Sequence, residues 1–276
     1  MADEDRSGPG SDRATLAGSF GSVAGHYERF RPGPPEAAVE WYLPRRVGRV
    51  VDLGAGTGAL TRLLVERADD VVAVEPDDRM RAVLATEVPG ARALPGSGES
   101  MPLADGSADA VIASTSWHWM DPHSTLAEVA RVLVPGGTLG ALWTGPDPDG
   151  AFLSEARSRM ARAGAAGSSH GRDLSGLVEE SIGRDDDALV IPDGVPFDQP
   201  DRATFTWDIA LDADDLLGLL GTFSWVITLP DDTRASILDL ARELLVAFGI
   251  DGSTTVEVAW RTEAWRSRRR HPDERT

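Results

Sequence analysis

A glycine-rich turn directly follows a short apolar run in the first quarter of the chain. The run is Val50–Leu53, and the turn is GAGTG at residues 54–58. Glycine lets a ligand approach the main chain closely, and a helix predicted from Ala59 to Arg67 would direct its N–H groups toward an anionic group such as a carboxylate. Glu75 lies 21 residues after Gly54, where a carboxylate can accept hydrogen bonds from ribose hydroxyls. These features predict a nucleoside ligand.

Two details favour a positively charged nucleoside over a dinucleotide. The glycine spacing is G-x-G-x-G, whereas pyrophosphate-binding turns show G-x-G-x-x-G. Asp52 stands just before the first glycine, where its charge would oppose a phosphate and suit a sulfonium. An NAD(P)-dependent oxidoreductase remains an alternative at this point. In the structural alternative, Asp52 caps a turn and Glu75 is an exposed acid.

The segment STSWHWMD, residues 114–121, holds a second group of chemically useful side chains. His118 could remove or receive a proton from an acceptor, or orient it, because histidine titrates near neutral pH. The alternative is a hydrogen-bonded structural histidine between two indoles. Aromatic residues from several segments are candidates for the wall of an acceptor pocket, or else belong to the core. They are Phe20, Trp117, Trp119, Trp143, Phe223 and Trp225.

Alternating strand and helix patterns surround these residues and predict an α/β fold with a doubly wound, mostly parallel sheet. The predicted strands are Arg49–Leu53, Val71–Glu75, Ala91–Leu94, Asp109–Ser114 and Thr138–Trp143. Besides the helix after the glycine turn, helices are predicted at Asp78–Thr86 and His123–Leu133. Pro135–Gly137 is predicted to end the last of these helices.

The flanking segments extend this plan. Helices are predicted at Leu16–Phe30, where the run RPGPP ends the first, and at Glu36–Leu43. Residues 1–15 are predicted to be a disordered tail, and residues 16–276 a single domain in which 146–200 form an insertion or lid over the acceptor site. A strand at Thr204–Leu211, helices at Asp212–Leu220 and Asp231–Phe248, and a strand at Thr254–Arg266 complete the prediction.

Composition excludes several classes of function. The chain has 276 residues and a net charge of −18, and its only basic run, at residues 266–270, is predicted to be a solvated tail. A nucleic-acid partner is therefore not expected. No apolar run approaches membrane-spanning length, so we expect no membrane partner and a cytoplasmic location. With no cysteine, and five histidines without ligand spacing, a metal site is not expected.

The combined motifs resemble those of the class I S-adenosylmethionine-dependent methyltransferases. The matching segments are VVDLGAGTGALT, VVAVEPDDRM, GESMPLADGSADAVIAS and EVARVLVPGG. The resemblance implies a Rossmann-like, seven-stranded methyltransferase sheet with a helical N-terminal segment and an inserted lid. FGSVAGHYERFRPGPP, STSWHWMD and VAWRTEAWRSRR are similar to the trans-aconitate methyltransferase-like group, which acts on small molecules. Pro34 departs from that group's RPGYP pattern.

The resemblance also implies roles for individual residues. Gly54, Ala55 and Gly56 would lie under the methionine part of S-adenosylmethionine, and Asp52 would precede them. Glu75 would hold the ribose, Pro76 and Met80 would flank the adenine, and Gly98, Glu99 and Ser100 would reach the adenine edge. Ser114 and Thr115 would contact the methionine end. Tyr27 and Arg31 would close over the cofactor, although Arg31 could equally pair with a surface carboxylate.

The expected reaction is methyl transfer from S-adenosylmethionine to a small organic acceptor, which leaves S-adenosylhomocysteine. Carboxylates, phenols, amines and aromatic carbons are all candidate acceptors. A non-catalytic cofactor-binding protein on the same fold is a further alternative. The sequence does not indicate the oligomeric state.

Overall fold

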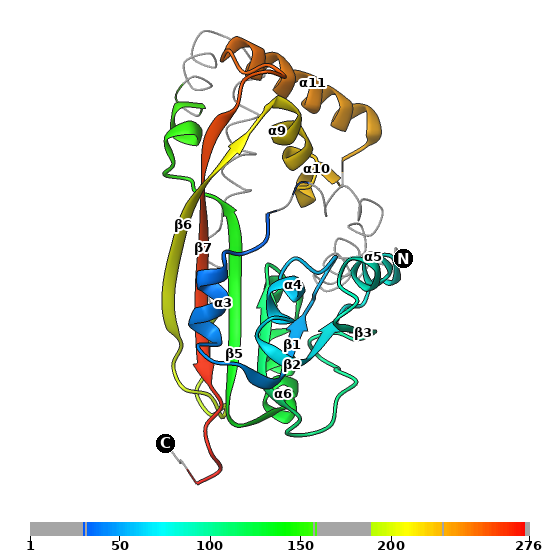
Figure 1. The fold of residues 1–276 in the computed structure, drawn as a ribbon, viewed down its shortest axis with the longest axis vertical. Coiled ribbons are helices and arrows are strands. Elements are labelled where there is room, and N and C mark those ends of the chain that lie inside the picture. The colour runs from blue at the N-terminus through cyan, green and yellow to red at the C-terminus, as the bar shows by residue number, and fades with distance from the viewer. Residues whose placement is uncertain (1–29, 31, 157, 159–188, 228, 274–276) are drawn as a thin grey trace, which may run out of the picture.

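The computed structural model describes residues 30, 32–156, 158, 189–227 and 229–273. Within this part of the chain, seven strands form one sheet in the order β3-β2-β1-β4-β5-β7-β6 (Figure 1). The first five strands are parallel, and β7 is antiparallel to both of its neighbours. The strands are β1 Val47–Leu53, β2 Ala68–Val74, β3 Arg92–Leu94, β4 Ala108–Ser114, β5 Leu133–Pro146, β6 Asp201–Leu211 and β7 Val256–Arg268. The predicted seven-stranded, doubly wound fold is confirmed.

Helices cover both faces of the parallel strands. α3 (Glu36–Tyr42) and α4 (Thr61–Leu64) pack on one face, and α6 (Pro122–Val132) packs on the other. α5 (Asp78–Glu87) follows β2. Strands that are covered on both faces require nearly continuous apolar runs, which explains why the ends of β1 and β2 are rich in buried valine. The core of the molecule therefore lies directly beneath the carboxyl ends of these strands.

Two local predictions are wrong. The predicted helix Ala59–Arg67 contains only one helical turn, α4, because β2 begins at Ala68 and pairs with β1 from Val47 onward. The glycines after α6 do not separate that helix from the next strand. Instead β5 begins at Leu133, and a register shift against β4 between Ala108 and Ala110 accommodates the irregular backbone.

The basic run near the C-terminus is not the predicted solvated tail. Arg266 on β7 lies 4.3 Å above the ring of Trp41 and donates to the carbonyl oxygen of Trp41 at 2.7 Å. Arg269 and Arg270 donate to the carbonyl oxygens of Leu133 and Val195. These contacts are local cation–π and hydrogen-bond interactions that fix β7 against α3 and neighbouring loops.

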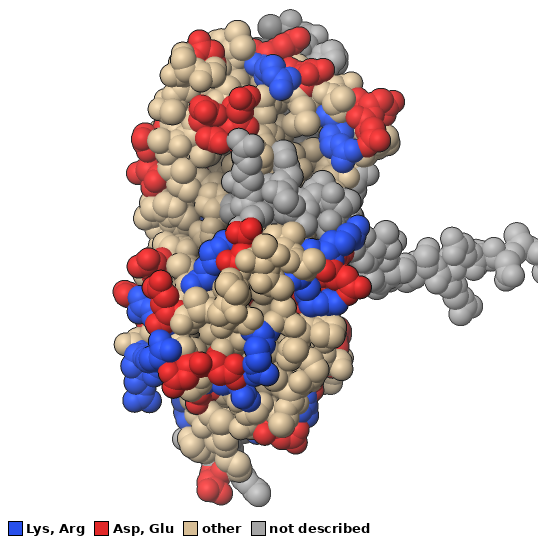
Figure 2. All heavy atoms as spheres, turned by 45° about the vertical axis from the view of Figure 1, so that its right-hand side comes forward, with Lys and Arg blue, Asp and Glu red and all other residues tan. Residues whose placement is uncertain are grey.

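Basic and acidic side chains are interspersed on the face of the molecule shown in Figure 2. Asp70 binds both Arg49 and Arg92, and Arg131 binds Glu128 and Asp105. Local pairing therefore neutralises these arginines. The expectation of no nucleic-acid partner stays a prediction that this arrangement supports.

The long strands β5, β6 and β7 extend past the carboxyl ends of the other strands and carry three helices there (Figure 1). These helices are α9 Ala213–Leu220, α10 Ser224–Ile227 and α11 Asp231–Ala247, and we call them the cap. Leu219 of α9 packs with Val258 and Trp260 of β7 in an apolar cluster, which joins the cap to the strands. The cap thus stands on the side of the sheet where α/β proteins bind ligands.

The predicted insertion, residues 146–200, is described only in part. Residues 151–156 are helical. Leu189, Ile191 and Phe197 are buried in the main core, so this end of the segment is anchored there. Most of the predicted lid, the predicted tail and the helix before Phe30 lie outside the described residues. Within the described residues, no helix is long and apolar enough to cross a membrane.

Candidate functional site

The glycine turn follows β1 and has a left-handed backbone at all three glycines. The φ angles are +69° at Gly54, +56° at Gly56 and +100° at Gly58. The N–H groups of Gly54 and Ala55 donate to the carbonyl oxygen of Val74 at 2.8 and 3.2 Å, which fixes the turn against β2. Because α4 has only four residues, the predicted contribution of a helix dipole to anion binding loses its basis.

Gly54 and Gly56 are glycines for different reasons. A Cβ at Gly54 would come within 2.6 Å of the Cβ of Ser116, so packing excludes any side chain there. A Cβ at Gly56 would meet no atom of the described residues within 4 Å. The turn therefore presents open backbone at Gly56, which is what a ligand lying across it requires.

Glu75 sits beside this open backbone. Its Oε2 accepts the N–H of Gly56 at 2.9 Å, and its Oε1 accepts the N–H of Asp77 at 2.9 Å. The residue is only 8% exposed, and burial raises the pKa of its carboxyl group, while the two backbone hydrogen bonds oppose that rise. Each carboxylate oxygen keeps acceptor capacity. Glu75 and the glycine turn are therefore in direct contact, and the ribose-binding role of Glu75 stays a prediction.

Asp52 lies beneath the turn and does not reach the surface. It is fully buried, and its Oδ2 accepts the Thr61 hydroxyl at 2.6 Å. Its Oδ1 has no hydrogen-bond partner in the described structure. Burial raises the pKa of Asp52 to about 7; the Thr61 hydrogen bond opposes the rise, and the charge of Glu75 adds to it. Asp52 therefore ties the first residue of α4 to β1 and shapes the turn from below.

The loop after β3 closes on the start of α6. Ser97 and Ser100 form an isolated antiparallel bridge. Glu99 accepts the N–H of Asp121 at 2.8 Å through its Oε1. Gly98 is buried, and it packs so closely against Met120 that a Cβ at this position would come within 2.5 Å of the methionine sulfur. Pro76, which follows β2, is exposed, and Met80 of α5 is buried.

The backbone is strained where β4 ends. Thr115 has a φ of +53°, which β-branched residues rarely adopt, and such outliers concentrate at functional sites. Its hydroxyl accepts the N–H of Thr144 on β5 at 3.4 Å. This turn places Ser116 under the glycine turn, where its hydroxyl donates to the carbonyl oxygen of Leu53 at 2.7 Å. Ser114, the last residue of β4, is half-buried.

A short 3-10 turn, η2 (Trp117–Trp119), follows at once. Trp117 is 5% exposed and belongs to the core, so we no longer assign it to an acceptor pocket. His118 and Trp119 are half-buried, with ring centroids 4.6 Å apart. The indole N–H of Trp143 donates to Nδ1 of His118 at 3.2 Å. Trp143 is itself buried and contacts His118 through this hydrogen bond.

Comparisons with known proteins agree with this geometry. Residues 51–141 match a family described as a methyltransferase domain. An uncharacterized methyltransferase of Mycobacterium tuberculosis is 40% identical over 237 residues, which cover 84% of this chain and 88% of that protein. The chain is a class I S-adenosylmethionine-dependent methyltransferase.

Solved structures share the fold of this methyltransferase. A protein assigned as a type II methyltransferase from Anaeromyxobacter dehalogenans has a TM-score of 0.61 at 24% identity, covering 87% of this chain and 99% of that chain. Phosphoethanolamine N-methyltransferase 2 of Haemonchus contortus, in complex with S-adenosylhomocysteine, has a TM-score of 0.52 at 14% identity, covering 91% and 58%.

Family membership decides against the oxidoreductase that the glycine turn had left open. The resemblance to the trans-aconitate methyltransferase-like group stays a prediction, because the relatives named above do not test it.

The methyltransferase brings some predicted site residues together and leaves others unplaced. Phe223 is half-buried between α9 and α10, and Trp225 lies within α10. Phe20, Tyr27 and Arg31 lie outside the described residues.

The sequence reasoning missed Phe30. A Cβ at Gly218 of α9 would come within 2.5 Å of its ring, and a Cβ at Gly33 would come within 3.2 Å of the carbonyl oxygen of Ala59. The segment from Phe30 to Gly33 therefore joins the cap to the end of the glycine turn. A lone phenylalanine beside the run RPGPP gave no signal of these contacts.

Thr61 and Ser116 were also missed, and each fixes the glycine turn through one hydroxyl. Single hydroxyl residues carry no spacing pattern. The clues in the sequence were that Thr61 follows the glycine turn and that Ser116 lies within STSWHWMD.

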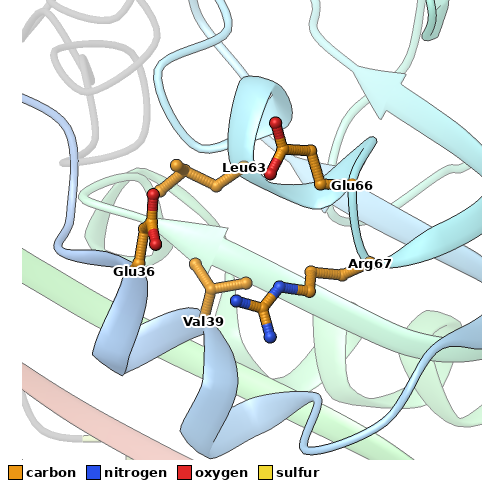
Figure 3. Close-up of a pocket in the computed structure, with 5 residues that line it drawn as sticks. All are labelled: Glu36, Val39, Leu63, Glu66 and Arg67. Atoms are coloured by element: carbon orange, nitrogen blue, oxygen red, sulfur yellow. The ribbon is translucent and has the colours of Figure 1, made fainter.

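A shallow depression between α3 and α4 lies apart from this site (Figure 3). It is lined by Glu36, Val39, Leu63, Glu66 and Arg67. Arg67 forms an ion pair with Glu40 at 2.8 Å. The depression contains none of the predicted site residues, so we do not assign it to the methyltransferase reaction.

Proposed function

We propose that this methyltransferase binds S-adenosylmethionine across the glycine turn and transfers its methyl group to a small organic acceptor. The observation that carries the proposal is the pair formed by Gly56 and Glu75. The backbone at Gly56 is left-handed and open, and a nearly buried carboxylate is hydrogen-bonded to its N–H. An acid in this position suits ribose hydroxyls, as the fit to a nucleoside requires.

Other residues complete the proposed cofactor site. Gly98, Glu99 and Ser100 would line the adenine edge, with Met80 and Pro76 on the other side. Ser114 and Thr115, together with the turn at residues 54–56, would hold the methionine end, and Tyr27 and Arg31 would cover it. Bound S-adenosylmethionine would supply a methyl group on a sulfonium, which is already a strong electrophile.

The chain's main task is then to position the acceptor and exclude water. His118 and Trp119 stand at the carboxyl edge, next to the strained end of β4. The segment Phe30–Gly33 contacts Gly218 of the cap through Phe30 and Ala59 through Gly33, and these contacts support a role in covering the site. Phe20, Phe223 and Trp225 are proposed to contribute apolar surface to the acceptor pocket, while Trp143 lies behind His118.

A thermal-shift titration tests cofactor choice. Because a ligand that binds only the folded state stabilises it in proportion to RT ln(1 + [L]/Kd), S-adenosylhomocysteine should raise the melting temperature in a dose-dependent way. NAD and NADP should leave it unchanged. A shift with NAD(P) alone, or none with S-adenosylhomocysteine, would contradict the proposal.

A second assay separates an enzyme from a non-catalytic binding protein. Radiolabelled S-adenosylmethionine is incubated with panels of carboxylates, phenols, amines and indoles, and transfer of label is measured. We expect incorporation into one class, and less of it in Gly56→Ala at limiting S-adenosylmethionine. A protein that binds S-adenosylhomocysteine but turns over no cofactor with any panel or with cell extract would support the non-catalytic alternative.

A further inference from the structure

The hydrogen bond between Trp143 and His118 constrains the histidine more than a packing contact would. The indole nitrogen of Trp143 is a donor only, so Nδ1 of His118, 3.2 Å away, has to be the acceptor. A neutral imidazole carries one proton. With Nδ1 accepting, that proton resides on Nε2.

The geometry around the pair keeps the indole in place. Trp143 is 9% exposed, and its ring meets the ring of Trp265 edge-on at 5.2 Å. The next residue, Thr144, donates its N–H to Thr115, which precedes the 3-10 turn that carries His118. The hydroxyl of Thr144 also lies 2.8 Å from that of Thr262 on β7. Next to Trp143, β5 is thus joined to the end of β4 and to β7.

A general base at this position would need the opposite state of the ring. To take a proton on Nε2, His118 needs its lone pair there, and its hydrogen would then be on Nδ1, facing the indole N–H. The imidazolium form has a hydrogen on both nitrogens and creates the same conflict. Two donors that face each other leave a half-buried polar group unsatisfied, which is unfavourable.

We propose that Trp143 is a positioning residue that holds His118 as the neutral tautomer with its proton on Nε2, so that His118 acts toward the acceptor as a hydrogen-bond donor and not as a general base. The proposal rests on the proposed function, because it assigns a role within that site. It also specifies the acceptor chemistry. The methylated molecule presents an oxygen or nitrogen lone pair to this donor and arrives in its nucleophilic form, since His118 does not remove its proton.

Nitrogen NMR of the full chain tests the tautomer directly. The protein is labelled with ¹⁵N, and the ring nitrogens of His118 are assigned by loss of their signals in His118→Gln and by their persistence when each of the other four histidines is replaced singly. At neutral pH we expect Nδ1 to resonate as an unprotonated nitrogen and Nε2 as a protonated one. A protonated Nδ1 in the wild-type protein would overturn the proposal. The spectrum needs neither cofactor nor acceptor, so this result is independent of whether methyl transfer is confirmed.

A matched pair of variants tests the cause. Trp143→Phe keeps an aromatic ring but removes the donor, and we expect both nitrogen signals of His118 to move toward the averaged positions of a tautomer mixture. Trp265→Phe alters the other half of the same ring pair without touching His118, so the wild-type signals should persist. Unchanged signals in Trp143→Phe, or equal changes in both variants, would show that the hydrogen bond does not select the tautomer.

Discussion

The side chains of the sheet platform are more completely buried than those of α11 in the cap. In the platform, strands and helices meet in two extended clusters whose members are almost all fully buried, such as Leu53, Val72 and Leu126. Within the cap, four of the eight residues of α9 are buried, whereas Leu245 is the buried residue among the 17 residues of α11, and Val246 beside it is 64% exposed. Few buried contacts permit local opening at low cost in free energy. The contrast indicates that α11 opens more easily than the platform.

Polar contacts follow the same division. Beneath the glycine turn, Asp52, Glu75 and Ser116 each hold a specific backbone or hydroxyl group in place. The cap helices instead present acidic side chains to solvent, such as Asp214 and Asp232. A cofactor has to be held within a fraction of an ångström for in-line transfer, whereas the acceptor must enter and leave.

The largest expected effect compares one leucine from each region. Leu126→Ala on α6 removes a fully buried side chain from the platform core, and we expect a loss of about 3–5 kcal/mol in the free energy of unfolding. Leu245→Ala on α11 should cost about 1–2 kcal/mol, because its surroundings are less completely packed. Urea denaturation measures both values. Equal losses would remove the distinction between a rigid platform and a loosely packed cap.

Asp52 makes the platform sensitive to pH. Its pKa of about 7 lies above the ordinary value of 3.8, so the folded protein binds more protons than the unfolded chain between these values, and stability falls as the pH rises through that interval. In Asp52→Asn this contribution disappears. We expect the wild-type protein to lose up to about 4 kcal/mol relative to the variant between pH 4 and pH 8, from about three pKa units at about 1.4 kcal/mol each.

Urea denaturation of both proteins across that range checks the prediction. The pKa of Glu75 is also raised, and Glu75 is present in both proteins, so their difference reports Asp52 together with its interaction with Glu75. Parallel stability curves would mean that Asp52 is not the buried titrating group.

Glu75→Ala should weaken binding of S-adenosylhomocysteine by about 1.5–3 kcal/mol, the usual value of a hydrogen bond to a charged group. The loss combines the proposed ribose contact with the support that Glu75 gives to Gly56 and Asp77. Asp78→Ala, one turn away on an exposed position of α5, is the control and should bind normally. Calorimetry with unchanged affinity in Glu75→Ala would remove this residue from the site.

The smallest effect is expected in the cover itself. Hydrogen exchange with and without S-adenosylhomocysteine should show slower exchange in the cap or in the segments 1–30 and 146–200, if these close over the bound cofactor. The buried ends of β1 and β2 should already exchange slowly without it. Identical exchange in every cover segment would leave these segments without the proposed role.

The sequence predicted the platform well because its signals are local. The run VVDLGAGTG and the acid at Glu75 identify one strand, one turn and one carboxylate within a single βαβ unit, and the structure brings the turn and the carboxylate into contact. The lengths of α4 and β5 were predicted wrongly, because strand pairing from Val47 and Leu133 overrides local helix and turn preferences.

The acceptor side depends on contacts between distant segments. Trp143 is 25 residues from His118, and their hydrogen bond exists only because β4 and β5 are neighbours. The positive φ of Thr115 and the burial of Trp117 two residues later are likewise revealed by no composition pattern. The contact between Phe30 and Gly218 also joins two segments that are far apart in the sequence.

The central claim, that S-adenosylmethionine binds across the open backbone at Gly56, is tested most directly by comparing two glycines. Gly106 has a φ of +55°, close to the +56° of Gly56, and a Cβ at either position would meet no described atom within 4 Å. Alanine should therefore strain both sites equally, by roughly 1 kcal/mol. In calorimetric titrations with S-adenosylhomocysteine, Gly56→Ala should bind at least about tenfold more weakly than the wild-type protein, equivalent to about 1.4 kcal/mol, while Gly106→Ala should bind with wild-type affinity. Wild-type affinity in Gly56→Ala, or an equal loss in both variants, would contradict the assignment of the cofactor site.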